Sequence, residues 1–420
     1  MWPDRGEPIV SLSVHAELSA VEADWRRFEQ AADCTPFQTF QWLEAWQRHI
    51  GLRNGVTPAI VIGRHADGEI MFLMPLAVAG RRAPKPLRWL GQELCDYNAP
   101  LLAADFARCI TPARFPTVWR QIRDLLQRDP RLRHDWIELE KMPERVGGQI
   151  NPFTGLEVAL NASGAHQVQL GGDWDTFYTG RRSAATRRRD RIKRKRLSEF
   201  GEVRFVTAAT EQEAAGNFAT LMRQKAQALA RMGVRNIFAR PGYREFYLEL
   251  ATDPRARGLV HVSRLAVGSA AAAANLGLTF RDCYYHVLAS HDGGELSRYG
   301  PGAMHLRELL RHATTLGLQR FDFTIGDEAY KQEWSDTAAP LYDHVTDVTW
   351  RGWTASRLSI IRHGVKRFVK QTPVLWQSFR HLRALRAGPA CFGRLVQRPG
   401  RRRASGAARA LPLAGHEGQQ

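Results

Sequence analysis

The chain has 420 residues, of which 44% are apolar and 24% charged, values that exclude an intrinsically disordered protein and are ordinary for a globular one. This length exceeds what one core usually supports, so two domains are expected. The net charge of +18 is unevenly distributed: residues 181–199 hold ten Lys or Arg against two acids, and residues 357–420 hold fourteen against one. The remaining chain is slightly acidic, which excludes a protein that grips nucleic acid over its whole surface.

The ends of the chain and its cysteines indicate a cytoplasmic protein. The first ten residues, MWPDRGEPIV, lack the apolar stretch of a secretory signal. The longest notable uncharged run, residues 265–280, is too short to span a bilayer. The five cysteines are scattered without paired spacing, as is typical of reduced thiols.

The first part of the chain predicts helices at 21–31 and 36–51, followed by a β-hairpin that turns at Asp67 and Gly68. A helix at 116–127 and a strand at 135–140 follow. The loop GQELCDYNAPLL at 91–102 precedes that helix, and in it Asp96 and Tyr97 are candidates for binding substrate. The alternative is a turn in which Asp96 and Asn98 satisfy local backbone donors.

A strongly basic segment, RRSAATRRRDRIKRKRLSEF at 181–200, follows a short strand at 166–170. Good helix formers and a terminal Gly201 predict a helix with few residues able to pack. Either this helix is a solvated surface, or it attracts an anion such as a nucleotide phosphate, a sugar-diphosphate lipid head group or RNA. In the second case Arg188 and Lys193 are substrate-binding candidates.

The second half predicts helices at 211–231 and 242–252 and an antiparallel meander of strands at 259–267, 271–280 and 283–290. The turn Gly300-Pro301-Gly302 then opens a helix at 302–316, and a strand at 320–325 follows. A glycine turn that feeds a helix N-terminus suits an anion, because the first N–H groups there have no intrahelical partner. The candidates for binding a donor cofactor are Arg298, Gly300, Gly302 and Ala303, although Pro301 removes one N–H.

Polar residues cluster at the end of this last strand. Tyr330 is a candidate acid, Asp322 and Glu328 are candidate bases, and Lys331 is a candidate for stabilising an oxyanion or holding a phosphate. The alternative is a solvated turn with an ion pair, in which Tyr330 only packs. Histidines show no metal-ligand spacing and no G-x-S-x-G is present, so neither a metal nor a covalent serine mechanism is expected.

Five phrases in order carry a family resemblance: TPFQTFQWLEAW, DYNAPLL, the basic segment, YGPGAMHLRELL and FDFTIGDEAYKQEW. The chain resembles GNAT acyltransferases of the CelD/BcsL group, associated with cellulose and exopolysaccharide synthesis, and is similar in layout to FemABX transferases. The resemblance implies an α/β (α+β) fold with two tandem GNAT-like domains, each a mixed, mostly antiparallel sheet flanked by helices. The expected boundaries are 1–170, 171–350 and a basic helical tail at 351–420.

The resemblance implies an N- or O-acyltransferase, most simply an acetyltransferase, that moves an acyl group from acyl-CoA to a sugar or amine acceptor. GNAT turns often read Arg/Gln-x-x-Gly-x-Gly/Ala, whereas Ser297 stands three residues before Gly300, so an acyl carrier protein remains an alternative donor. Two other readings are an aminoacyl-tRNA-dependent transferase of the FemABX kind, suggested by the basic helix, and a non-catalytic assembly factor.

The tail at 357–386 alternates bulky apolar and basic residues and breaks at Pro373. A basic amphipathic helix is typical of a peripheral contact with anionic lipid. The alternative, favoured for 357–372, is a helix docked on the body. Beyond Gly388 the chain lacks core-forming residues and is predicted to be disordered.

Overall fold

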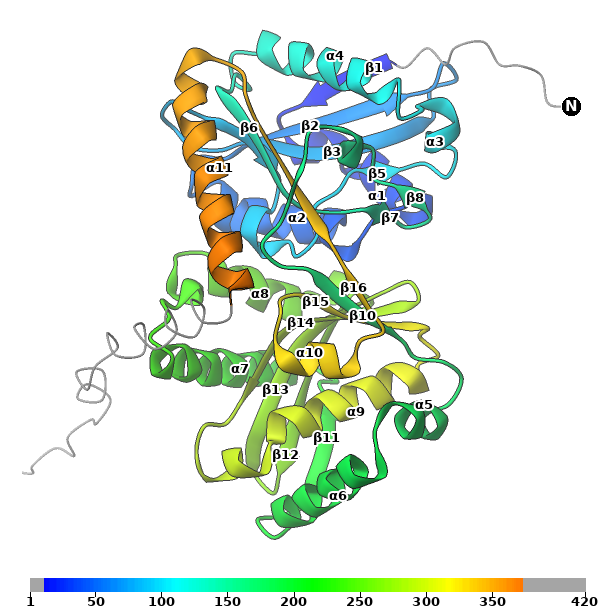
Figure 1. Ribbon diagram of the computed structural model, residues 1–420, viewed down its shortest axis with the longest axis vertical. Helices are drawn as coiled ribbons and strands as arrows, with labels where there is room; N and C mark the ends of the chain where they lie inside the picture. The colour runs from blue at the N-terminus through cyan, green and yellow to red at the C-terminus, as the bar shows by residue number, and fades with distance from the viewer. Residues whose placement is uncertain (1–10, 373–420) are drawn as a thin grey trace, which may run out of the picture.

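The computed structural model describes residues 11–372, which form two α/β bodies stacked along the long axis of the molecule (Figure 1). Each body is a mixed sheet flanked by helices, as the sequence predicts. Between residues 11 and 372, no helix combines the length and the apolar character needed to cross a bilayer.

The first sheet has the order β1-β2-β3-β4-β6-β17-β9, with β5 also paired to β3. Its strands are β1 (Ser11–His15), β2 (Thr57–Arg64), β3 (Ile70–Val78), β4 (Pro86–Trp89), β5 (Leu101–Leu102), β6 (Trp136–Pro143), β9 (Ala159–Leu160) and β17 (Leu341–Asp347). A short hairpin, β7 (Arg145–Val146) and β8 (Gln149–Ile150), lies beside it. The main helices of this half are α1 (Glu22–Ala31), α2 (Phe40–Trp46), α3 (Phe106–Cys109) and α4 (Phe115–Arg128).

The second sheet has the order β11-β12-β13-β14-β15-β10-β16. Its strands are β10 (Ala165–Gln169), β11 (Val203–Thr207), β12 (Val260–Val267), β13 (Ala270–Phe280), β14 (Cys283–His291), β15 (Arg320–Ile325) and β16 (Thr337–Ala339). Its helices are α5 (Trp174–Arg181), α6 (Ala184–Ser198), α7 (Glu211–Arg231), α8 (Tyr243–Thr252), α9 (Pro301–Thr315) and α10 (Ala329–Trp334). The predicted meander at 259–290 and the strand at 320–325 are confirmed.

The two halves repeat one feature that matters for function. Each sheet contains a run of antiparallel strands, and the last strand of the run pairs in parallel with a later strand. These parallel pairs are β4 with β6, which follows α4, and β14 with β15, which follows α9. β4 pairs with β6 only at Pro86↔Trp136 and Leu87↔Ile137, and β14 pairs with β15 only from Cys283↔Arg320 to Tyr285↔Asp322. The partner strands diverge beyond these positions, which leaves an opening in each sheet.

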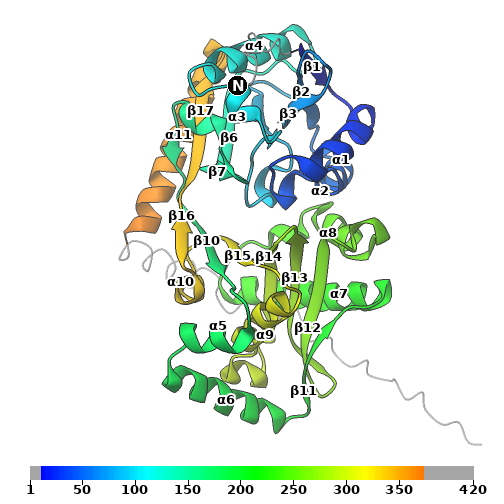
Figure 2. The same cartoon turned by 90° about the vertical axis from the view of Figure 1, so that its right-hand side faces the viewer.

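Two strands lie in the sheet opposite to the one expected from the sequence. β10, placed in the first half by the boundary at 170, pairs with β15 and β16 of the second sheet, and β17, placed in the second half, pairs with β6 and β9. The two crossing segments run side by side between the bodies (Figure 2). The exchange occurs because a strand joins whichever sheet offers an unpaired edge in reach, which chain order does not record.

The halves also share a hydrophobic core. Aromatic residues at the start of α2 reach across the interface: the ring of Trp42 lies 5.0 Å from that of Phe246, and Phe37 lies 6.2 Å from Tyr285. Gly242 allows α8 to approach the first half, since a Cβ there would lie 2.1 Å from the carbonyl oxygen of His49. The two bodies are therefore packed as one unit.

The tail begins as α11 (Trp350–Gln371), within one residue of the expected boundary at 351. Thr349 caps it, with the N–H of Gly352 donating to its hydroxyl at 3.2 Å. The helix lies against β17 and β6, so the predicted docking on the body is confirmed. The predicted break at Pro373 and the tail beyond it lie outside the described residues.

Candidate active site

The loop of the first half that carries Asp96 and Tyr97 meets the end of β15 across the interface. The Tyr97 hydroxyl donates to Asp322 Oδ1 at 2.7 Å, and the N–H of Thr324 donates to the same oxygen at 2.7 Å. Thr324 has a φ of +61°, a strained conformation for a β-branched residue. Tyr97, a substrate-binding candidate, is thus in direct contact with Asp322, a catalytic candidate that lies 225 residues later in the chain.

Burial changes the acidity of both carboxyl groups at this contact. Burial raises the pKa of Asp322 to about 6, although the bonds from Tyr97 and Thr324 oppose the change. Burial also raises the pKa of Asp96, against the nearby cations Lys141 and Lys331. Asp96 is partly buried, whereas Asp322 is buried and its Oδ1 has two donors.

Lys331 lies on α10, directly below this contact. It is only 4% exposed, its Nζ donates to the carbonyl of Ile325 at 2.8 Å, and the Glu328 carboxylate lies 3.2 Å away. A buried ammonium group that contacts one carbonyl oxygen and one carboxylate is a positive charge held in a fixed position. Lys331 and Glu328 therefore form an ion pair, as the alternative interpretation of this cluster predicts. The pair lies near Asp96 and Asp322.

Tyr330 stands beside these groups, with its ring 6.4 Å from that of His286. Burial and the neighbouring charge of Glu328 raise its pKa. The phenol therefore remains protonated at neutral pH and is a proton donor, as an acid role requires.

Two further residues of the site escaped the sequence analysis. Lys225 of α7 interrupts an otherwise apolar helix side, and its Nζ donates to the carbonyl of Ala289 at 3.3 Å. Burial lowers the pKa of Lys225, while Glu328 and Asp96 act to raise it. Burial, Lys331 and Lys225 lower the pKa of His286 to about 3, so its imidazole is neutral. The lysine within the apolar stripe was the available signal; nothing local distinguished His286.

The glycine turn lies at the other end of β14. Gly300 has φ 65° and ψ 52° and precedes α9, whose first turn leaves the N–H groups of Gly302 and Ala303 without an intrahelical acceptor. Lys193 of α6 reaches this turn, since its Nζ lies 3.5 Å from the position of a Cβ on Gly300. Gly300, Ala303 and Lys193 line one hollow together with Arg307 of α9.

The other two basic candidates are not drawn into this hollow. Arg298 is paired with Glu295 at 3.1 Å and stacks on Tyr299, while Arg188 is exposed on α6. Leu197 is the one buried residue of α6, as expected for a helix with few packing residues.

β14 connects the turn to the polar cluster. Gly302 packs against His291 at the end of the strand, Lys225 binds the carbonyl of Ala289, and Thr324 donates to the carbonyl of His286 at 3.4 Å. Residues 286–291 span about 16 Å of extended chain. β15 is not paired beside residues 287–291, so this length of β14 has no neighbouring strand on that side.

Comparison with known proteins gives a family match within the second half of the chain and a similarity in fold. Residues 184–332 match the family described as "Acetyltransferase (GNAT) domain". The fold is similar to that of FemX, with a TM-score of 0.54 and 10% identity over 80% of this chain and 97% of FemX. A conserved protein of unknown function from Bacteroides thetaiotaomicron aligns with 80% of this chain and 100% of its own, at 12% identity and a TM-score of 0.49.

A tandem GNAT protein from the clavulanic acid biosynthesis pathway covers 80% of this chain and 98% of its own, at 11% identity and a TM-score of 0.40. No curated protein matches the chain significantly. At such identities the likeness concerns the fold alone. Residues 184–332 thus form a GNAT-type acetyltransferase domain within a two-sheet fold similar to that of FemX.

Proposed function

We propose that the protein transfers an acyl group from acyl-CoA to a hydroxyl or amine that enters between the two halves. One observation carries the proposal: the loop with Asp96 and Tyr97 meets β15 where the pairing of β15 with β14 ends, at the head of the proposed donor groove along β14. The donor would lie along β14 with its phosphates at Gly300, Gly302 and Lys193. The acceptor would approach from the first half.

The side chains supply the groups that acyl transfer needs. Asp96, partly buried and with a raised pKa, would accept the proton of the acceptor. The Lys331 ammonium would stabilise the oxyanion, and the protonated Tyr330 phenol would donate to the leaving thiolate. Asp322, already bonded by Tyr97 and Thr324, would position the loop, and Glu328 would hold Lys331.

Calorimetry with acetyl-CoA and longer acyl-CoAs, followed by transfer assays on sugar and amine acceptors, tests this function. Lys331→Met and Tyr330→Phe should each lower transfer about 100-fold with little change in donor affinity. Lys193→Ala should weaken donor binding instead. Absence of binding to any thioester would refute the proposal. Full transfer in both variants would favour a non-catalytic site here.

The resemblance of five phrases to the CelD/BcsL group supports a narrower proposal. The acceptor would be a sugar or amine of exopolysaccharide or envelope synthesis, handled at the cytoplasmic side. Mass-shift assays on oligosaccharide acceptors, compared with free amino acids, test this narrower statement.

A second function is favoured by the position of α6. This helix carries exposed cations, and its Lys193 reaches the donor turn. A donor that combines an acyl group with a long polyanion, namely aminoacyl-tRNA as in transferases of the FemABX kind, would suit it. Binding of tRNA should then fall steeply with salt and be lost when Arg188, Arg189 and Arg191 are reversed to Glu. Salt-insensitive or absent binding excludes this function.

α11 suggests a membrane partner because its apolar residues face away from the body. Gly352, Ser356 and Ser359 are buried against the sheet, while Trp350, Leu358, Ile361, Val365 and Phe368, which share the opposite side, are each more than half exposed. The helix carries six Lys or Arg and no acid. We propose that this side contacts an anionic lipid surface.

Flotation with phosphatidylglycerol vesicles tests the contact, with phosphatidylcholine vesicles as the uncharged comparison. Ile361→Asp and Phe368→Asp should abolish binding to the anionic vesicles. Leu52→Asp, at an apolar residue equally exposed elsewhere, should leave it unchanged. Equal binding in all variants, or concentration-dependent dimers that the α11 variants dissolve, would contradict the lipid contact.

A further inference from the structure

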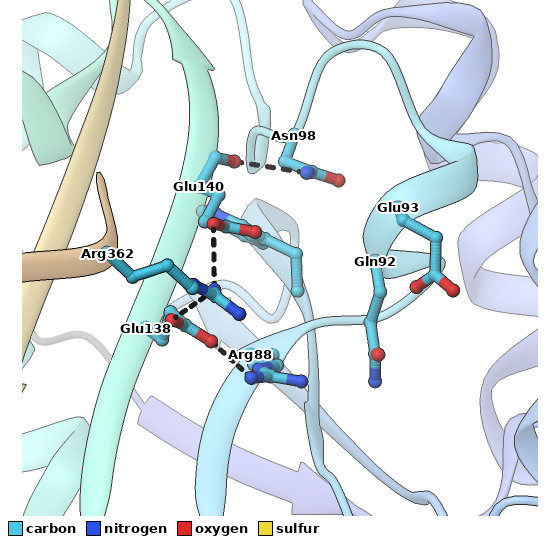
Figure 3. A pocket seen from close by; sticks show the side chains of 8 residues that line it. Arg88, Gln92, Glu93, Asn98, Glu138, Glu140 and Arg362 are labelled. Atoms are coloured by element: carbon cyan, nitrogen blue, oxygen red, sulfur yellow. Dashed lines mark hydrogen bonds and ion pairs between the residues drawn. The ribbon is translucent and has the colours of Figure 1, made fainter. Parts of the chain in front are cut away.

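The first half has a pocket of its own where β4 and β6 diverge, the place that corresponds to the donor groove of the second half. It encloses about 180 Å³, more than one water requires. Figure 3 shows Arg88 beside Glu138, Arg362 reaching toward Glu138 and Glu140, and the Asn98 amide nitrogen directed at the backbone of Glu140. The loop that supplies Gln92 and Asn98 also supplies Asp96 and Tyr97 of the interface.

The carboxylates of this pocket already have partners. Glu138 accepts from Arg88 and from Ser359 of α11, and Arg362 lies 3.3 Å from it. Glu140 binds His363 at 2.6 Å. Glu138, Glu140 and His363 are close enough together to surround a cation, but two guanidinium groups neutralise them. The pocket therefore does not suit a divalent metal ion.

Three polar atoms of the lining side chains lack partners despite being buried. They are two donors, Arg88 Nε and Gln92 Nε2, and one acceptor, Asn98 Oδ1. Asn98 is only 2% exposed. Each buried polar atom without a partner costs about 1–3 kcal/mol, and native proteins retain few of them. Three in one pocket indicate that something else satisfies them.

Backbone strain is concentrated in the same wall. Gln92 has a φ of +45° and Lys141, next to Glu140, has a φ of +57°. Lys141 holds the loop through bonds from its Nζ to the carbonyls of Glu93 at 3.0 Å and Cys95 at 2.8 Å. Strained non-glycine residues of this kind persist where the surrounding contacts fix them, often at binding sites.

The free atoms and the fixed charges together select a class of ligand. An anion would use the two donors but would meet Glu138, Glu140 and the Asn98 carbonyl oxygen. A cation would meet Arg88 and Arg362. A hydroxyl group both donates and accepts, so a neutral group with several hydroxyls satisfies donors and acceptor alike.

We propose that this pocket binds a sugar ring with uncharged hydroxyls. This inference rests on the proposed acyl transfer in one respect: the bound sugar is taken to be part of the acceptor. One loop would then hold the sugar through Gln92 and Asn98 while Asp96 faces the transfer site, which places the acceptor at the interface.

The test measures binding of glucose and N-acetylglucosamine to the full chain by calorimetry, with glucuronate, inorganic phosphate and MgCl2 as comparisons. Gln92→Gly removes one donor and suits the positive φ. It should weaken neutral-sugar binding three- to tenfold. Trp89→Phe, whose ring packs on Phe153 on the other face of the sheet, should not.

Two results would overturn the proposal: no binding of either neutral sugar, or equal binding in wild type and Gln92→Gly. Stronger binding of glucuronate, phosphate or Mg²⁺ would also overturn it. Acyl-CoA affinity, measured on the same samples, reports separately on the donor groove. Loss of sugar binding with intact acyl-CoA binding would therefore refute this inference and leave the proposed transfer standing.

Discussion

At the scale of single residues, the site depends on a few buried charges that face each other across the interface. Asp322 is the clearest case: its carboxyl group is buried, accepts from Tyr97 and Thr324, and has a pKa near 6 instead of the ordinary 3.8. Its charged form is therefore less favourable in the folded protein than in the unfolded chain. Asp322 stabilises the site geometry but destabilises the fold at neutral pH.

Replacement of Asp322 by Asn should raise stability at neutral pH. Between the unfolded pKa of 3.8 and the folded value of about 6 the folded state binds the extra proton, so stability falls as pH rises through this window. Asn keeps an oxygen that accepts from Tyr97, and its gain should reach about 1–3 kcal/mol at pH 7 and vanish near pH 4. Urea unfolding at both pH values measures it.

Asp124→Asn, at an exposed acid of α4, is the matched control and should show no such pH dependence. A constant difference between Asp322→Asn and wild type from pH 4 to 8 would contradict the raised pKa.

Replacement of Lys225 by Met should separate the contribution of this residue to folding from its contribution to donor binding. The ammonium group is desolvated and lies among Asp96, Glu328 and Lys331, so its loss removes a positive charge from the groove. We expect the chain to stay folded, because Met fills the space of the lysine stem, while affinity for acyl-CoA falls about tenfold. Calorimetry with acetyl-CoA checks this, with Arg231→Met, at the end of the same helix, as control.

At the scale of elements, the attachment of α11 illustrates how charge holds a helix whose inner side is polar. His363 binds Glu140 at 2.6 Å and lies 3.8 Å from Asp343. The bond from Glu140 raises the pKa of His363. Burial by itself would raise the pKa of Glu140, but the bond from His363 and nearby cations bring it down to about 2. The helix thus depends on an ion pair more than on apolar packing.

The ion pair between His363 and Glu140 should stabilise the attachment of α11 most strongly within a limited pH range. The contribution of His363 is complete below its unfolded pKa of 6.5 and is lost as pH rises through its raised folded value. That of Glu140 is complete above 4.5 and is lost as pH falls toward about 2. His363→Gln should cost about 1–2 kcal/mol at pH 5.5 and less at pH 9.

Denaturant unfolding at the two pH values measures this difference. His65→Gln, at a longer 3.8 Å contact with Asp105, is the control and should have a smaller effect. An equal cost for His363→Gln at pH 5.5 and pH 9 would show that the charge pair does not hold the helix.

At the scale of the whole molecule, two features bind the halves together. β10 and β17 are exchanged between the sheets, and one hydrophobic cluster contains buried residues of both halves, among them Trp42, Phe246 and Tyr285. Unfolding either half alone would remove the strand next to the edge of the other half's sheet and expose this shared core.

The full chain should therefore unfold in one transition. Tryptophan fluorescence and far-UV circular dichroism should give coincident curves in urea. A fragment of residues 11–160, which lacks β17 and α11, should not fold, because β6 loses its neighbour. Two separated transitions, or a stable fragment 11–160, would show that the halves are independent.

Some of this could be read from the sequence because it depends on near neighbours. Helix 211–231 has a capping box of Thr210 and Glu213 and a regular apolar side, and the strand at 320–325 is bounded as expected. The donor turn was found from Gly300 and Gly302, and the basic helix from its lack of packing residues. Asp96, Tyr97 and Lys331 were selected as polar residues next to predicted strands.

The tertiary structure decided what depends on distant partners. Pairing of β17 with β6, the contact of Tyr97 with Asp322, and the pocket that joins Arg88, Asn98 and Glu138 unite residues far apart in the chain. The sequence by itself determined the long helices of the second half, the meander at 259–290, the strand at 320–325 and the place of the glycine turn, because local hydrogen bonds, caps and periodicity fix these. Burial and strand pairing arise only when the whole chain packs. Burial sets the protonation state of the site residues, and strand pairing brings those residues into contact.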